Sequence, residues 1–260
     1  MELGLSGKVA IVTGASKGIG RAIAEMLATE GMAVVTSARS EALLQSLASD
    51  LRSHGRTVLV HAADLSQPET PAALVDAALR EFGRIDLVVN NAGATKRGDF
   101  LTLTETDWHD GYALKFFAAV RITRAAWPAL VKARGSVVNI AGVGGRTGSA
   151  EFTIGGSVNA AMLNLTKSLA DRGVYEGVRV NAINPGSIVT DRLITRIDRL
   201  AQEQGLTREE AELKLTRQQN VARFGDCDEI AAAVAFLASH HGGYLNGAII
   251  DIDGGMTRTL

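Results

Sequence analysis

Short apolar runs alternate along this chain with longer segments in which apolar residues recur at helical spacing. Leu43, Leu44, Leu47 and Leu51 show the helical spacing, and the run from Val9 to Val12 is typical of a buried strand. We expect strands over 9–12, 33–37, 57–61, 85–89, 136–140, 178–183 and 248–252, and helices over 41–54, 70–82, 104–134, 156–172 and 226–239.

This alternation predicts an α/β fold: a single Rossmann-type, doubly wound domain over residues 1–260. It would hold a seven-stranded parallel sheet with helices on both faces. Pro128 marks a kink or a late break in the 104–134 helix. Segment 190–225 is polar and amphipathic, without a strand pattern, and predicts a helical excursion on the substrate side of the sheet. Ligands of such sheets bind beyond the carboxyl ends of the strands.

Composition narrows the class of protein. The 260 residues suit one large domain, and 46% of them are hydrophobic. Lys and Arg number 27 and Asp and Glu 28, a balance that argues against nucleic-acid or membrane partners. The single cysteine, Cys227, permits no intrachain disulfide and suggests a cytoplasmic protein. We expect no signal peptide, no membrane span and no metal site.

A glycine-rich turn links the first predicted strand to the first predicted helix. The stretch 13–20 reads T-G-A-S-K-G-I-G, with the glycine spacing G-x-x-x-G-x-G. Backbone N–H groups at a helix N-terminus suit a phosphate, and glycine allows the tight turn and close approach. A plain strand-to-helix turn is the alternative. The flanking strand and helix favour nucleotide binding by Gly14, Ser16, Lys17, Gly18, Ile19 and Gly20.

Side chains that follow the other strands predict which nucleotide is bound. Strand two ends in Ala38-Arg39, where an acidic residue would bind the ribose 2′-hydroxyl. Arg39, with Lys17 beside it, instead suits a 2′-phosphate and predicts NADP(H) rather than NAD(H). Solvated surface charges are the alternative. Asp64 either accepts from the adenine amino group or caps a helix. The remaining predicted cofactor contacts are Leu65, Asn91, Ala92, Gly93, Pro185, Gly186, Ile188 and Thr190.

Four stretches occur in order along the chain: Thr13-Gly14-x-x-x-Gly18-Ile19-Gly20, Asn90-Asn91-Ala92-Gly93, Val180-Asn181-Ala182 running into Pro185-Gly186, and Asp253-Gly254-Gly255. Together they resemble the motifs of the short-chain dehydrogenase/reductase family, over essentially the whole chain. The resemblance implies a Rossmann domain, NAD(P)(H), hydride transfer between a carbonyl and an alcohol carbon, and usually a tetramer. We expect a homotetramer, or a heterotetramer with a related chain.

The resemblance also implies where catalytic groups should lie. The family's Asn follows a Trp at a fixed distance, which leads from Trp108 to Lys115. The family's Ser, Tyr and Lys fall on Gly142, Gly155 and Asn159, so all four positions are substituted. Two outcomes are open for the lysine. It brings an ammonium to the same cavity, or it fills space and pairs with a carboxylate. Replacing Tyr and Ser by glycine predicts a hole that water or a bulky substrate occupies.

Three functions fit these observations. The first is an NADP(H)-dependent oxidoreductase with non-standard proton-transfer groups, the second a catalytically silent nucleotide-binding subunit of a hetero-oligomer or a regulatory nucleotide sensor. The third is a non-redox lyase or hydrolase that uses Lys115. The substrate is a small molecule, and Lys96 with Arg97 would favour an anionic one. Further candidates lie in the loop before Gly155, at Arg146, Ser149, Glu151 and Thr153.

Overall fold

The computed structural model describes residues 2–258 and contains a sheet of seven parallel strands. The strand order is β3-β2-β1-β4-β5-β6-β7, which confirms the predicted fold class. The strands are β1 (Val9–Thr13), β2 (Ala33–Ala38), β3 (Val58–Ala62), β4 (Leu87–Asn90), β5 (Ser136–Ile140), β6 (Arg179–Pro185) and β7 (Ile249–Ile252). Each central strand is buried on both faces because helices cover both sides.

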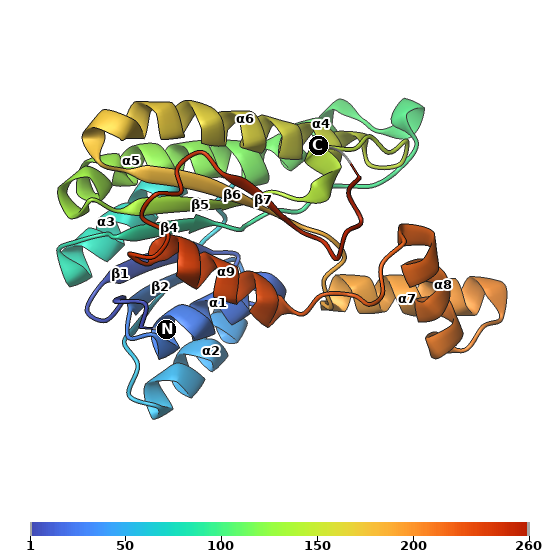
Figure 1. Cartoon of the computed structure of the whole chain (residues 1–260), viewed down its shortest axis with the longest axis horizontal. Coiled ribbons are helices and arrows are strands. Elements are labelled where there is room, and N and C mark those ends of the chain that lie inside the picture. The colour runs from blue at the N-terminus through green and yellow to red at the C-terminus, as the bar shows by residue number, and fades with distance from the viewer. Residues whose placement is uncertain (1, 259–260) are drawn as a thin grey trace.

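Helices cover the two faces of the sheet in separate layers (Figure 1). One layer contains α1 (Gly18–Thr29), α2 (Glu41–Ser53) and α9 (Cys227–Ala238), whose apolar residues form one core cluster with the sheet. The other contains α3 (Thr70–Phe82), α5 (Ala118–Ala133) and α6 (Thr153–Glu176), which form the second cluster. No helix within residues 2–258 combines the length and the hydropathy needed to cross a bilayer.

The predicted 104–134 helix is interrupted, but not at its proline. It consists of α4 (Glu105–Tyr112), a π-helical turn η2 (Ala113–Phe117) and α5, and Pro128 lies inside α5 without ending it. The predicted late break is therefore wrong, since α5 ends only where Arg134 adopts a positive φ of 49°. A π turn widens the backbone ring by one residue and is frequent at functional sites. Lys115 lies within this turn.

Segment 190–225 forms α7 (Asp191–Gln204) and α8 (Arg208–Gln219), which project beyond one end of the sheet (Figure 1). The two helices pack on each other through a small separate core. Its buried members are Leu193, Ile197, Ala211, Leu215 and Phe224. Two short 3-10 turns, η1 (Phe100–Thr102) and η3 (Val143–Gly145), complete the elements of the described residues.

The strand order reverses between β1 and β4, and a buried hydroxyl joins the two strands there. Thr13 Oγ1 accepts from the backbone N–H of Asn91 at 2.9 Å and of Ala92 at 3.0 Å, and donates to Val89 O at 3.2 Å. The Asn91 amide returns a bond to Thr13 O at 2.9 Å. Such a switch point is where doubly wound sheets form their ligand crevice.

Thr13→Val should therefore destabilise the protein more than the same change elsewhere in the sheet. It leaves two backbone N–H groups without an acceptor, which costs about 2–3 kcal/mol. Thr36, equally buried in β2, makes one long bond of 3.4 Å to Leu59 O, so Thr36→Val should cost about 1 kcal/mol or less. Urea unfolding of both variants measures the difference, and equal losses would contradict the role given to Thr13.

Candidate functional site

The glycine turn after β1 leaves a helix N-terminus open to an anion. Gly14 has a φ of +67°, and a Cβ on Gly20 would lie 2.2 Å from Gly14 O, so both positions require glycine. At the start of α1, Lys17 makes no side-chain capping bond and the first turn holds no acidic residue. The N–H groups and the helix dipole therefore suit a phosphate. This fits the pyrophosphate of a dinucleotide.

An arginine without a carboxylate partner among the described residues follows β2, where the sequence predicts the adenosine end of a dinucleotide. Arg39 is exposed just beyond β2, and no carboxylate among residues 2–258 lies within 4.0 Å of it. Lys17 forms an ion pair with Asp191, with 3.6 Å between Nζ and Oδ2, and both side chains are exposed. Asp64 Oδ1 accepts from Ser66 N at 3.0 Å and Ser66 Oγ at 2.8 Å, and these bonds, with a smaller effect of Arg39, lower the pKa of Asp64. Asp64 thus caps the turn that follows β3.

Residues after β4 and β6 build the floor of the crevice. Asn91 uses its amide on Thr13 O and Gly14 O, so it joins two loops. A Cβ on Gly93 would lie 2.9 Å from Lys115 Cδ, so this glycine makes room for the lysine stem. Past Pro185, a Cβ on Gly186 would lie 2.8 Å from Asp253. Two further predicted contacts, Ile188 and Thr190, lead into α7, and Leu65 is buried after β3.

Lys115 enters the centre of the site from the π turn. Its Nζ donates to Ala141 O at 2.7 Å, and no carboxylate among residues 2–258 lies within 4.0 Å of it. Of the two outcomes left open for Lys115, pairing with a carboxylate is therefore not found among residues 2–258. Burial, and to a smaller extent the positive charge of Arg192, lower the pKa of the ammonium to about 8. An amine with this pKa can exchange a proton near neutral pH.

Gly142, which follows the Ala141 that binds Lys115, packs against Asn159. Gly142 follows Ala141 with a φ of +150°, which L side chains rarely adopt, and its N–H donates to Asn184 Oδ1 at 3.1 Å. A Cβ on Gly142 would lie 3.0 Å from Asn159 Nδ2. Asn159 is 3% exposed, and its Oδ1 has no hydrogen-bond partner among residues 2–258. This buried oxygen therefore carries the cost of an unmade hydrogen bond.

Phe152 fills the space above Gly155, so the predicted water- or substrate-filled hole at this glycine is wrong. A Cβ on Gly155 would lie 2.1 Å from the Phe152 ring. The ring settles on the glycine because an empty cavity would forfeit dispersion contacts. On its outer side, the Arg97 guanidinium stacks 4.1 Å from the ring centroid. The only sequence signal for this packing was the spacing of Phe152 and Gly155, which lie three positions apart at the start of a helix.

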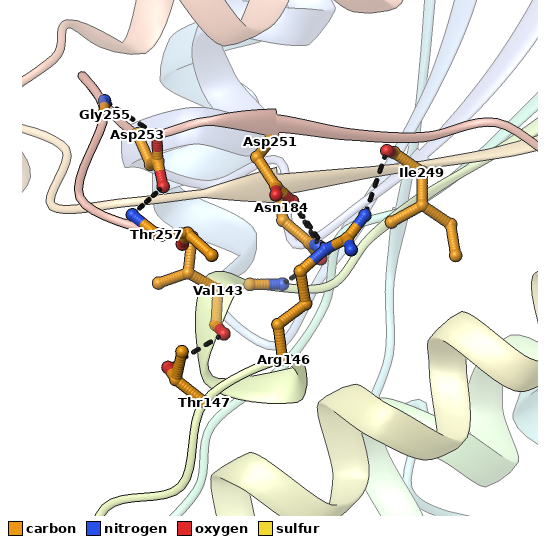
Figure 2. A network of polar contacts seen from close by, with 10 residues as sticks. Val143, Arg146, Thr147, Asn184, Ile249, Asp251, Asp253, Gly255 and Thr257 are labelled. Atoms are coloured by element: carbon orange, nitrogen blue, oxygen red, sulfur yellow. Dashed lines mark hydrogen bonds and ion pairs between the residues drawn. The ribbon is translucent and has the colours of Figure 1, made fainter. Parts of the chain in front are cut away.

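Among the loop candidates, Arg146 has a structural role. Its Nε donates to Asp251 Oδ1 at 3.1 Å, the same oxygen accepts from Asn184 Nδ2 at 2.8 Å, and Asn184 holds Gly142 (Figure 2). Arg146 therefore anchors the loop after β5 to β7. It does not point at the centre. Ser149 and Glu151 are exposed, whereas Thr153 Oγ1 is buried without a partner among residues 2–258.

Arginines of α7 join Arg97 around a pocket of about 250 Å³. Lys96, expected beside Arg97, instead binds Asp107 at 2.9 Å and does not line the pocket. Asp107 explains the difference, because it closes the capping box of Thr104 at the start of α4 and holds the Lys96 ammonium there. The α7 arginines were not expected from the sequence. The pocket is lined by Thr95, Arg97, Phe152, Arg192, Thr195, Arg196 and Arg199.

Fold, glycine turn and crevice together define a dinucleotide-binding α/β protein, and comparison with known proteins gives its family. A family model described as enoyl-(acyl carrier protein) reductase matches residues 14–257. The chain belongs to the short-chain dehydrogenase/reductase family.

Its relatives match over nearly their full lengths. A 3-oxoacyl-[acyl-carrier-protein] reductase, FabG, of Vibrio cholerae is 36% identical over 255 residues, covering 98% of this chain and 99% of the relative. An uncharacterized oxidoreductase of Mycobacterium tuberculosis is also 36% identical, covering 97% and 93%. The crystal structure of L-sorbose reductase from Gluconobacter frateurii, complexed with NADPH and L-sorbose, is 33% identical with a TM-score of 0.96, and all of both chains is covered.

The lowered pKa of Lys115 makes a prediction about stability. Protonating this amine costs folding free energy below about pH 8, and the cost disappears as the pH rises from about 8 to 10.5. Lys115→Met should therefore raise the free energy of unfolding at pH 7 by roughly 1–3 kcal/mol, the lost bond to Ala141 O offsetting part of the gain. The gain should shrink toward about pH 10.

Urea unfolding of wild type and variant at the two pH values measures this difference. Lys132, an exposed lysine of α5, supplies the control, and Lys132→Met should show no such pH-dependent difference. A Lys115→Met protein that is less stable at pH 7, or a gain that does not depend on pH, would contradict the burial of the charge.

Proposed function

We propose that the chain is an NADPH-dependent reductase of a small carbonyl compound, in which Lys115 supplies the proton. The single observation that carries the proposal is this lysine, with a pKa of about 8 and held on Ala141 O at the carboxyl edge of the sheet. Family membership and a related structure complexed with NADPH support the cofactor. The open N-terminus of α1 and the unpaired Arg39 offer sites for its phosphates.

We further propose that the family's Asn, Ser, Tyr and Lys positions are occupied by Lys115, Gly142, Gly155 and Asn159. The local backbone supports this assignment. A serine at Gly142 would require a strained φ of +150°, and a tyrosine at Gly155 would collide with Phe152. The backbone at Gly142 and the packing around Gly155 therefore each favour glycine over a residue with a side chain.

Bound NADPH would supply the hydride. Lys115 then has the role of general acid. One of its N–H groups stays on Ala141 O, and another donates to the carbonyl oxygen of the substrate as negative charge develops there. The neutral amine left behind regains a proton from solvent.

The other two functions expected from the sequence lack such support. The relatives reported above are named as reductases or oxidoreductases, which favours a redox enzyme over a silent subunit or a Lys115-dependent lyase or hydrolase. The tetramer, of identical or of related chains, and the cytoplasmic location stay predictions.

The nucleotide preference tests the role of Arg39. NADPH should bind at least about tenfold more tightly than NADH, because a guanidinium–phosphate bond contributes about 1.5–3 kcal/mol. Arg39→Asp should reverse the preference. Fluorescence titration with both nucleotides measures it. Arg80→Asp, which reverses an exposed charge on α3, should leave the ratio unchanged, and equal affinities in the wild type would refute the assignment.

Turnover tests the role of Lys115. Because the acid form is needed for reduction, the single-turnover rate of NADPH oxidation should fall as the pH rises through about 8. Lys115→Met should lower the rate by about 10²–10⁴ at pH 7 and change NADPH affinity little. A panel of ketones that includes L-sorbose serves as substrate, and Lys132→Met is the control. Brisk turnover by Lys115→Met would place the donor elsewhere, with the unpaired Thr153 hydroxyl as the next candidate.

A further inference from the structure

The pocket beside Phe152 brings together four guanidinium groups from two distant parts of the chain. Arg97 follows β4, whereas Arg192, Arg196 and Arg199 come from α7. Their positions are four and three residues apart, so they share one face of the helix. That face is turned toward the loop that carries Arg97, and the pocket between them measures about 250 Å³.

The positive charge of this pocket is not balanced by the protein. Among residues 2–258, no carboxylate lies within 4.0 Å of Arg97, Arg192 or Arg196, and Arg199 has only Glu203 at 3.6 Å. The two aspartates of α7 pair outside the pocket, Asp191 with Lys17 and Asp198 with Arg208.

Burial lowers the pKa of Arg97, and Arg196 lowers it further, despite an opposing effect of Glu151. Like charges held this close are unfavourable unless an anion joins them. The pocket therefore has the electrostatic character of an anion site.

Arg97 is also held in place before any ligand arrives. Its guanidinium stacks on Phe152, which in turn packs on Gly155. The N–H of Gly98 donates to Glu151 O at 3.1 Å and ties the two loops together. A side chain that is already ordered loses less conformational entropy when it binds. The planar guanidinium then meets a carboxylate or phosphate with two parallel hydrogen bonds.

The pocket and the proposed proton donor meet at the loop after β4. Gly93 of this loop packs on the stem of Lys115, with a Cβ there 2.9 Å from Lys115 Cδ, and Thr95, two residues further on, lines the pocket. The positive charge of Arg192 also acts on Lys115. We propose that Arg97, Arg192 and Arg196 recognise an oxyanion, phosphate or carboxylate, on a short carbonyl substrate whose reacting carbon faces Lys115. That the bound anion is a substrate rests on the proposed reductase function, whereas the anion site itself does not depend on turnover.

Two matched pairs of probes test this proposal by calorimetric titration of the protein loaded with NADP⁺. Dihydroxyacetone phosphate against dihydroxyacetone forms the phosphate arm, and pyruvate against hydroxyacetone forms the carboxylate arm. In at least one arm the anion should bind about tenfold or more tightly than its neutral partner, and added salt should weaken it. Arg196→Gln and, separately, Arg192→Gln should each weaken the anion by about tenfold and the neutral compound by less than about twofold.

Arg208→Gln is the control, because Arg208 belongs to α8 and lies outside the pocket. Equal affinity for anionic and neutral probes in both arms would overturn the proposal, as would an equal loss with Arg208→Gln. Anion binding that NADP⁺ abolishes would also overturn it, since the arginines would then serve the cofactor. If NADP⁺ does not bind but the nucleotide-free protein keeps the anion preference, the anion site stands and the reductase function fails.

Discussion

The hydroxyl of Thr13 sits where the sheet reverses its order, and the geometry of both halves of the site follows from it. It accepts two backbone N–H groups of the segment after β4, which no neighbouring strand can serve once the strands diverge. The Asn91 amide adds bonds to Thr13 O and Gly14 O, so the glycine turn and the loop toward Gly93 form one unit. The open N-terminus of α1 and the lysine beside Gly93 are thereby fixed relative to each other.

The sequence predicted the parts of the molecule that depend on periodicity and on local backbone chemistry. Apolar runs located all seven strands, and the glycine spacing located the turn before α1, because both signals lie in neighbouring residues. The π turn around Lys115 left no such signal. Its extra residue is accommodated by packing, and Pro128, the more visible feature, stays inside α5. Arginines at 192, 196 and 199 have helical spacing, but which side they face depends on how α7 leaves the sheet.

Glycines at 142 and 155 do not leave an empty centre. The Phe152 ring packs on Gly155 and supports the Arg97 guanidinium, so the absence of a side chain at 155 makes room for the ring and places the arginine. Gly142 has a φ that a serine would strain to adopt, and its N–H is held by Asn184, which also binds the Asp251 partner of Arg146. Both loops are thus fixed by contacts that a serine at Gly142 and a tyrosine at Gly155 would disturb.

Lysine and arginine in one space oppose each other until an anion is present. Arg192 disfavours the protonated form of Lys115, and burial disfavours it more strongly. An oxyanion bound among the arginines would neutralise the charge of Arg192. The pKa of Lys115 would then rise, because Arg192 would no longer disfavour the ammonium form. More of the lysine would then be in its acid form when a substrate is bound than when the pocket is free. Because reduction consumes this proton, an anionic substrate would help to prepare its own donor, whereas a neutral ketone would leave the lysine closer to half ionisation near pH 8.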